Sequence, residues 1–394
     1  MAQSTVTLFG GADINFRNVK SGVNSFTGLA QDGIYSSRFG VQGVEDLGGG
    51  LKAGFHFEGG MNPDTGTPGG LTFTRKSTLG VMGGFGEVRL GRDYTPTFTV
   101  HGIADPFGTN GVGSFLNIAG STVVSDGSAL SADEVLLATG SFSAADRGTE
   151  RRTDASGLRA SARTDARLTL ADPNAVRANN SVTYYTPNFS GFSAAVMYSF
   201  GAENTYSLKK TGDMTSFNVR YDAGPISVGF GNQQTQGGLT AAAAGFAASS
   251  ATANAATTAV IGTDNQKWTT NLLAASYDLG VAKLSFMHRS DKLGGGGEAA
   301  KAEVNMIGAT VPMGATVLRA SYATKKASID GVGSTSAGKQ LAVGAIYSLS
   351  KRTSLYGTYA TLNNNQGFAN NVGSAAANSD NTSHGFEFGV KHNF

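Results

Sequence analysis

The eleven residues from His384 to Phe394 alternate between two kinds of side chain. Every second residue is aromatic or apolar, and the residues between them are small, polar or charged. Alternation with a period of two predicts a β-strand with one apolar face and one wet face. A strand that meets lipid on its outer face and a water-filled lumen on its inner face has this pattern. The question is then whether the whole chain divides into such strands.

Composition limits the alternatives. Hydrophobic residues make up 40% of the 394 residues, yet no apolar run approaches the roughly 20 residues that a membrane helix needs. A membrane protein of this composition must satisfy its backbone in lipid by closing a barrel. A net charge of +2 gives no reason to expect a nucleic-acid partner, and the absence of cysteine suits passage through an oxidising periplasm. No composition shift marks a domain boundary or a linker.

The alternation recurs along the chain and predicts sixteen strands joined by seven short and eight long connections in strict alternation. Short turns on one rim, long loops on the other and an even strand number are typical of a transmembrane barrel. We therefore predict an all-β, sixteen-stranded antiparallel transmembrane β-barrel with short periplasmic turns and long extracellular loops. The predicted strands are Thr5–Phe16, Ile34–Asp46, Leu51–Gly60, Thr72–Met82, Phe85–Arg92, Arg177–Pro187, Phe192–Gly201, Asp213–Asp222, Ile226–Gln234, Lys267–Asp278, Val281–Asp291, Ala302–Val311, Thr316–Lys326, Lys339–Ser348, Thr353–Leu362 and His384–Phe394.

One connection is far longer than the others. Residues 93–176 lack sustained alternation, and their Ala- and Arg-rich second part is expected to be partly helical around Ser143–Leu170. A loop of this length inside a compact domain is usually functional.

At the N-terminus, the first residues enter a strand without a basic n-region or an apolar h-region. We therefore expect a mature chain whose signal peptide is replaced by Met1.

Several motifs resemble the general porins of beta-proteobacteria, and most of all their anion-selective comamonad type. The resemblance implies a homotrimer of sixteen-stranded barrels in the Gram-negative outer membrane, each a single domain over residues 1–394. It also implies that the third long loop, about 93–176, folds inward to form the pore constriction, with Ser121–Asp172 as an insertion relative to the family. The motifs are Val6–Gly10, Ser37–Val41, Glu45–Gly54, Phe85–Arg92, Arg177–Asn180, Tyr184–Phe192 and the terminal Phe394.

Basic residues are the candidates for the pore constriction. Alternation places Arg38 on the lumen face, and Arg177 begins the strand after the long loop. The resemblance implies that Arg38, Arg75 and Arg177 form the basic cluster at the narrowest point, where guanidinium groups suit carboxylate or phosphate oxygens. Strict counting from the lipid-facing residues puts Lys76 inside and Arg75 outside, so either a bulge resets the register or Lys76 replaces Arg75. The plainer interpretation is that all four are ordinary lumen-wall charges.

Two carboxylates are candidate counter-charges to this cluster. Glu58 falls on the lumen face and Asp105 falls in the inward loop, where they could create a transverse field or position the arginines. Within the insertion, Arg159, Arg163 and Arg167 recur at helical spacing. They could form a second basic ladder, but acidic residues outnumber the arginines of this segment, which favours a solvated external helix.

These observations predict a passive channel. We expect a general diffusion porin that is selective for small anions, is surrounded by outer-membrane lipids and lipopolysaccharide, and passes small hydrophilic solutes. The five histidines lack metal-ligand spacing and no Ser–His pair stands out on the lipid face, so neither a metal, a cofactor nor an enzyme is expected. Two alternatives remain: a substrate-specific channel of the same fold for an organic acid or phosphate, and a surface adhesin or antigen.

Overall fold

The structure is a computed structural model of the 394-residue chain. It describes residues 5–66, 72–119, 122–124, 168–170, 176–201, 212–236, 239–242, 258–261, 267–294, 298–329, 333–365, 370–373 and 382–394.

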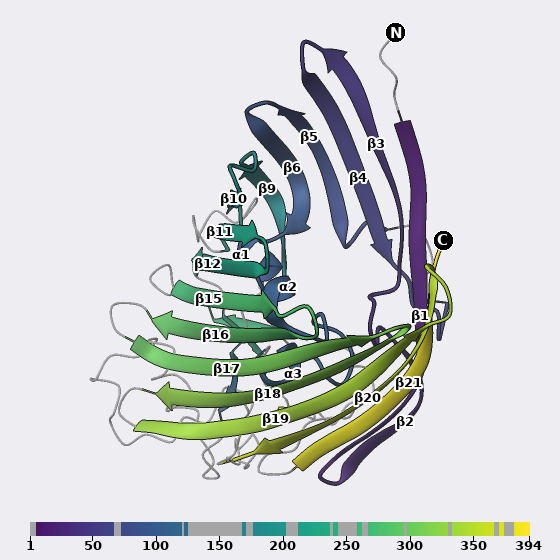
Figure 1. The fold of residues 1–394 in the computed structure, drawn as a ribbon. Coiled ribbons are helices and arrows are strands. Elements are labelled where there is room, and N and C mark those ends of the chain that lie inside the picture. The colour runs from purple at the N-terminus through teal and green to yellow at the C-terminus, as the bar shows by residue number, and fades with distance from the viewer. Residues whose placement is uncertain are drawn as a thin grey trace, which may run out of the picture.

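Sixteen antiparallel strands close into a barrel, as the sequence predicts (Figure 1). Each strand pairs with the next one in the barrel, and β21 closes the ring by pairing with β1 from Gly11↔Asn393 to Ser21↔Ser383. The barrel strands are β1 (Thr5–Ser21), β3 (Arg38–Gly48), β4 (Leu51–Gly60), β5 (Lys76–Gly83), β6 (Gly86–Tyr94), β9 (Arg177–Tyr185), β10 (Phe192–Ser199), β11 (Met214–Ala223), β12 (Ile226–Gln236), β15 (Lys267–Asp278), β16 (Lys283–Gly294), β17 (Glu298–Met313), β18 (Thr316–Ile329), β19 (Gly333–Ser348), β20 (Thr353–Asn364) and β21 (Thr382–Asn393).

Side chains sort between the two faces of the wall as the alternation predicts. In β1 the outward Val6 and Leu8 are exposed, whereas the inward Asp13 and Asn15 are buried. In β21 the outward Phe386 and Phe388 are exposed, and Glu387 between them is 1% exposed. The outer surface is therefore an apolar belt suited to lipid, and the inner surface is polar.

Hydrogen-bonded structure continues past the predicted strand ends. Residues 17–33 were expected to be loop, but β1 runs on to Ser21 and pairs with β2 (Asn24–Gln31). Strands β17 and β19 likewise extend several residues beyond the predicted limits. Outside the lipid layer a hairpin needs no apolar face, so the alternation ends before the hydrogen bonding does. Two two-stranded antiparallel sheets lie in the long connections among the described residues, β7 (Thr122–Val124) with β8 (Leu168–Leu170) and β13 (Leu239–Ala242) with β14 (Thr258–Ile261).

The long third loop begins with a segment that we call L3, Thr95–Ala119. It contains three short helices, α1 (Pro96–Thr99), α2 (His101–Ala104) and α3 (Leu116–Ala119). The Thr95 hydroxyl caps α1 by accepting a hydrogen bond from the Phe98 backbone N–H at 3.2 Å, and Pro96 fits the first turn. No helix among the described residues is long and apolar enough to span a membrane.

The rest of the long loop is only partly described. The helix predicted over Ser143–Leu170 lies outside the described residues except for its last three, which form strand β8 instead. The predicted ladder of Arg159, Arg163 and Arg167 also lies outside them.

Candidate functional site

L3 lies inside the barrel and follows its inner wall. Thr97 and Asn218 fix its start, because the Asn218 amide donates to the Pro96 carbonyl at 2.8 Å and Thr97 pairs with Ser216 at 2.9 Å. Further along, the loop contacts β16, β18, β21 and β19. The contacts are Ser285 Oγ to the Ala104 carbonyl at 2.7 Å, Arg319 to the Pro106 carbonyl at 3.3 Å, Gln340 to the Ser114 carbonyl at 2.9 Å and the Val112 N–H to Glu387 at 3.2 Å.

Glycines in the wall make room for the loop. A Cβ on Gly231 of β12 would lie 2.8 Å from Thr97 Cα, and one on Gly308 of β17 would lie 2.6 Å from Pro106 Cγ. Real Cβ atoms do not approach this closely, so any larger residue at Gly231 must displace backbone. The buried apolar cluster of the protein forms at the same contact, with Val100, Ile103 and Phe107 packed against wall residues. The wall from β11 to β21 is therefore the covered wall.

Asp105 organises this loop. Its buried carboxylate accepts hydrogen bonds from the backbone N–H groups of Phe107 and Thr109, both at 2.9 Å, and of Phe115 at 3.3 Å. Burial raises the pKa of Asp105, while these three donors and Arg319 act in the opposite direction. The structure thus places Asp105 against the covered wall and not beside the predicted arginines. Its predicted part in a field across the pore stays a prediction.

The wall from β3 to β9 carries the predicted basic residues, and Glu58 lies among them. Arg75 Nε donates to Glu58 Oε1 at 2.7 Å, and an Arg38 amino group lies 3.5 Å from the same oxygen. The Arg38 guanidinium also stacks over the Tyr35 ring, 4.2 Å from its centroid. One carboxylate therefore holds two guanidinium groups on the lumen side, with Glu58 itself 4% exposed.

Tyr94, at the end of β6, joins the third arginine to this group. Its hydroxyl accepts hydrogen bonds from Arg75 at 2.7 Å and from Arg177. The Arg177 guanidinium lies 4.2 Å above the Tyr94 ring, and Phe98 of α1 lies against this ring, with the two ring planes only 6° apart. Tyr94 thus connects the arginines to the start of L3. We call Arg38, Glu58, Arg75, Tyr94 and Arg177 the arginine array.

The register question at Arg75 and Lys76 has a simple answer. Strand β5 begins at Lys76, so the alternation that points Leu79 and Val81 outward does not apply to Arg75. Lys76 points inward as counted and lies 3.2 Å from Asp93. Arg75 reaches Glu58 from the connection before the strand, without a bulge. Both residues therefore face the lumen.

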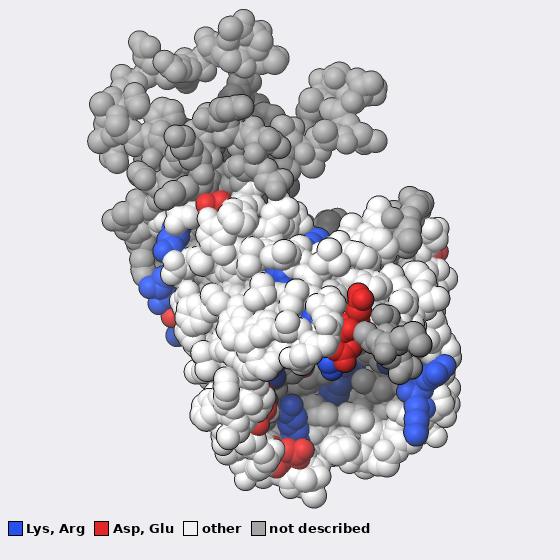
Figure 2. All heavy atoms as spheres, turned by 90° about the horizontal axis from the view of Figure 1, so that it is seen from above, with Lys and Arg blue, Asp and Glu red and all other residues white. Residues whose placement is uncertain are grey.

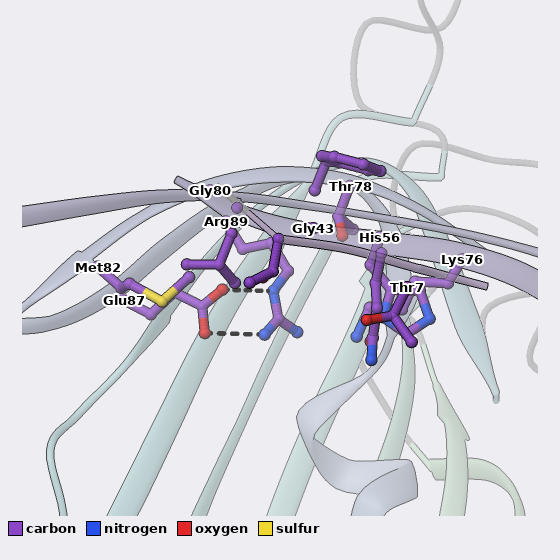
Figure 3. Close-up of a pocket in the computed structure, with 14 residues that line it drawn as sticks. Thr7, Gly43, His56, Lys76, Thr78, Gly80, Met82, Glu87 and Arg89 are labelled. Atoms are coloured by element: carbon purple, nitrogen blue, oxygen red, sulfur yellow. Dashed lines mark hydrogen bonds and ion pairs between the residues drawn. The ribbon is translucent and has the colours of Figure 1, made fainter. Parts of the chain in front are cut away.

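A second group of charges lines the same wall nearer the short turns. A cavity of about 260 Å³ is lined by side chains of β1, β3, β4, β5 and β6, among them His56, Lys76, Glu87 and Arg89. Figure 3 shows two contacts between Glu87 and Arg89, at 2.8 and 2.9 Å. Arg89 also contacts Asp93 at 2.5 Å. The view from above shows Lys and Arg side chains gathered within a hollow of the molecule (Figure 2).

Sequence reasoning missed two buried carboxylates, Asp13 beside the array and Glu387 beneath L3. Asp13 accepts hydrogen bonds from the backbone of Ile34 and Tyr35 at 2.8 and 2.9 Å, and from the Tyr356 hydroxyl. Glu387 pairs with Arg17 at 2.9 Å. A signal for both carboxylates was present, since each is a lone acid on the inward face of a strand whose other face is apolar. Within the described residues, no group of three or more His, Cys, Asp or Glu side chains could hold a metal ion.

A closed sixteen-stranded barrel with an inward loop and a charged, solvent-open wall beside it defines a transmembrane pore. The chain belongs to the Gram-negative porin family, whose sequence profile matches residues 1–367. It is accordingly an outer-membrane porin, and members of this family are channels rather than enzymes.

Individual relatives agree with this assignment. The chain is 34% identical to outer membrane porin protein 32 of Delftia acidovorans over 100% of this chain and 95% of the relative. It is 26% identical to an outer membrane porin of Bordetella pertussis over 91% of this chain and 89% of the relative. A solved structure of an anion-selective porin from Comamonas acidovorans superimposes with a TM-score of 0.72, at 29% identity and complete coverage of both chains. OmpT of Vibrio cholerae, at 16% identity and a TM-score of 0.60, shares the fold.

Proposed function

We propose that this porin is a passive diffusion channel selective for small anions, and that the arginine array is its selectivity filter. The observation that carries the proposal is that Arg38, Arg75 and Arg177 lie together on the uncovered wall, beside the inward loop L3. The array and the neighbouring residues Lys76, Glu87, Arg89 and Asp93 together contain five cations and three carboxylates. The excess positive charge raises the local concentration of anions in the lumen.

The chemistry of the array supports passage without tight binding. Each guanidinium keeps donors in reserve for a passing carboxylate or phosphate. Glu58 and Tyr94 already take several of those donors, so a permeating anion exchanges with existing hydrogen bonds instead of entering an empty cage. A site that binds weakly enough to release its ion conducts well. This is why the geometry favours general diffusion over a substrate-specific channel.

The proposed assembly is a homotrimer of single-domain barrels in contact with outer-membrane lipids and lipopolysaccharide. Support for the trimer comes from the shared fold of Vibrio cholerae OmpT, which has been solved in a trimer form. Three barrels in one assembly predict conductance steps in groups of three.

The test is single-channel recording in a planar bilayer under a KCl gradient. Wild type should show triple steps and a reversal potential of the sign expected for anion selectivity. Arg38→Ala should move that potential toward zero, and Arg220→Ala, an arginine of the lumen on β11 paired with Asp222, is the matched control. Cation selectivity in wild type, or an unchanged potential in Arg38→Ala, would overturn the filter. Saturable transport would indicate a substrate-specific channel, and absent conductance an adhesin.

A further inference from the structure

The outer face of β15–β19 carries one lysine on each of five successive strands. They are Lys267, Lys292, Lys301, Lys326 and Lys339. Each lysine is separated by an even number of positions from an exposed apolar residue of its own strand, so each points to the outward face. These apolar residues are, in the same order, Leu273, Phe286, Ile307, Tyr322 and Leu341. We call these five residues the lysine belt.

The belt lies at one height in the wall. The periplasmic ends of β15, β16 and β17 are Asp278, Lys283 and Met313. Counted along each strand from these ends, Lys267 lies eleven residues away, Lys292 lies nine residues away and Lys301 lies twelve residues away. Lys326 and Lys339 lie ten and nine residues from the equivalent ends Thr316 and Ser348. At about 3.3 Å per residue and a tilt of about 40°, this places the belt roughly 23–30 Å above the periplasmic rim. That is the outer edge of an apolar band about 25 Å tall.

Neighbouring positions in the belt are close together. Lys292 and Lys301 are direct cross-strand partners, as are Glu303 and Lys326, and Lys339 lies opposite Thr324. Lys301 Nζ contacts Glu303 Oε1 at 2.7 Å. Like charges directly opposite each other destabilise a sheet. An anion bound between Lys292 and Lys301 would relieve this repulsion. Glu303 is the single carboxylate at this height on the outer face of β15–β19 among the residues whose side chains the structure describes, so the belt keeps a strong positive excess.

The chemistry around the belt is that of a membrane boundary. Asn271, His288 and Asn305 follow the apolar residues on their strands, and the lysines come four residues further out. Lysine stems can lie along lipid while their ammonium groups reach the headgroups. The adjacent wall differs at its outer end, where Asn179 and Gln234 are uncharged and Asp213 bonds to Tyr198 at 2.8 Å.

We propose that the lysine belt binds the phosphorylated headgroup of lipopolysaccharide in the outer leaflet. The proposal gives a site to the lipid contact proposed above, and it rests on the outer-membrane location of the porin. The apolar row below the belt accommodates the acyl chains, and the clustered ammonium groups meet the phosphates at the height where such headgroups lie. A second copy of the chain is a poorer occupant, because its own belt would be repelled.

The experiment measures lipopolysaccharide binding to the folded porin in detergent by native mass spectrometry. Lys292→Gln, Lys301→Gln and Lys326→Gln are combined in one variant. The matched control combines Lys52→Gln, Lys283→Gln and Lys351→Gln, which removes the same charge near the periplasmic rim. We expect the belt variant to bind at least tenfold more weakly and the control to bind as wild type does. Removing the lipid A phosphates should weaken wild-type binding by a similar factor.

Other outcomes are equally informative. Wild-type affinity in the belt variant, equal loss in the control, or indifference to the phosphates would each overturn the proposal. If the belt variant fails to fold, Lys301→Gln alone and the salt dependence of wild-type binding replace it, and binding unaffected by KCl would refute an electrostatic site. Single-channel recording on the same variants separates this proposal from the filter, because a porin that loses lipopolysaccharide but keeps its anion selectivity supports both.

Discussion

The two inner walls of this barrel carry the same types of charged residue, but these residues have different roles on each wall. On the uncovered wall, the side chains of Arg38 and Arg75 are 21% and 12% exposed and share Glu58. On the covered wall, the side chains of Glu387 and Arg289 are 0% and 6% exposed. Both groups consist of guanidinium–carboxylate pairs that face the inside of the barrel. They differ in what surrounds them, which is water on the uncovered wall and other protein atoms on the covered wall.

The comparison shows that a lumen charge has no fixed role by virtue of its residue type. A guanidinium on the uncovered wall keeps some of its donors for water and passing ions. The same group on the covered wall is an anchor for L3, as Arg319 is for the Pro106 carbonyl. Removing a charge should therefore change selectivity on one wall and loop packing on the other.

The largest effect should follow the loss of an anchor. Glu387→Ala removes both the partner of the buried Arg17 and the acceptor of the Val112 N–H. Leaving a buried charge without its partner costs about 3–5 kcal/mol. We expect lower thermal stability of the folded barrel in detergent and faster proteolysis within L3. Glu303→Ala, on the lipid side, is the control and should cost under about 1 kcal/mol. Equal effects of the two changes would show that the covered wall is not special.

A steric change should loosen the loop without touching any charge. Gly231→Val places methyl groups where Thr97 Cα lies 2.8 Å from the Cβ position, and overpacking of this kind costs about 1–3 kcal/mol. We expect noisier open-channel currents because α1 is displaced. Gly84→Val is the control, since nothing lies within 4 Å of its Cβ position. Quiet currents from Gly231→Val would mean that L3 does not need the glycine.

Acid should loosen L3 through His101. This residue is buried in α2 with Nδ1 2.9 Å from the Phe98 carbonyl, and burial, assisted by Arg289, lowers its pKa to about 3. Between pH 6.5 and 3 the released loop binds a proton that the packed loop cannot, so packing is fully stable above pH 6.5 and weakens as the pH falls. At about 1.4 kcal/mol per pH unit, the loss at pH 5 is about 2 kcal/mol.

The measurement is the rate of proteolysis within L3 at pH 7 and pH 5. His101→Gln should remove most of the acceleration seen in wild type, because it cannot take up the proton. Asp105 titrates in both proteins and cancels from the difference. An identical pH response in the two proteins would refute the role of His101.

On the uncovered wall, Glu58→Gln should sharpen the filter. The change removes the carboxylate shared by Arg38 and Arg75 and raises the positive excess of the wall. We expect the anion-to-cation permeability ratio to rise by about twofold or more, with L3 proteolysis unchanged. A lower ratio would show that Glu58 serves the filter by positioning the arginines, not by moderating their charge.

The smallest effect should come from Tyr94→Phe. The ring remains for Arg177 and Phe98, but the hydroxyl that accepts from Arg75 and Arg177 is lost. One hydrogen bond to a charged group is worth about 1.5–3 kcal/mol, part of which water replaces in an open lumen. We expect anion selectivity to fall less than in Arg38→Ala, and Tyr198→Phe on the outer wall should leave it unchanged. A fall larger than that of Arg38→Ala would make Tyr94 the centre of the filter.

The strands and the inward position of Arg38 followed from alternation because lipid imposes period two on every strand. The array itself depends on contacts that no local pattern records. Tyr94 meets Arg75 and Arg177 across separations of 19 and 83 residues, and Glu387 meets Val112 across 275. Arg75 was misjudged by counting because it precedes its strand. Asp105 was a candidate counter-charge from its place in the loop, and the three backbone amides that bind it could not be read from the sequence.

The glycines beneath L3 have a consequence for protein engineering. Gly231 and Gly308 leave space on the covered wall that the backbone and Pro106 ring of L3 fill, so the shape of the wall matches this particular loop. Loop and wall therefore cannot be exchanged independently. A chimaera that receives the third loop of another porin will need the matching small residues on β12 and β17 as well. To redesign the pore size of this porin, a new third loop should be transplanted together with the small wall residues beneath it.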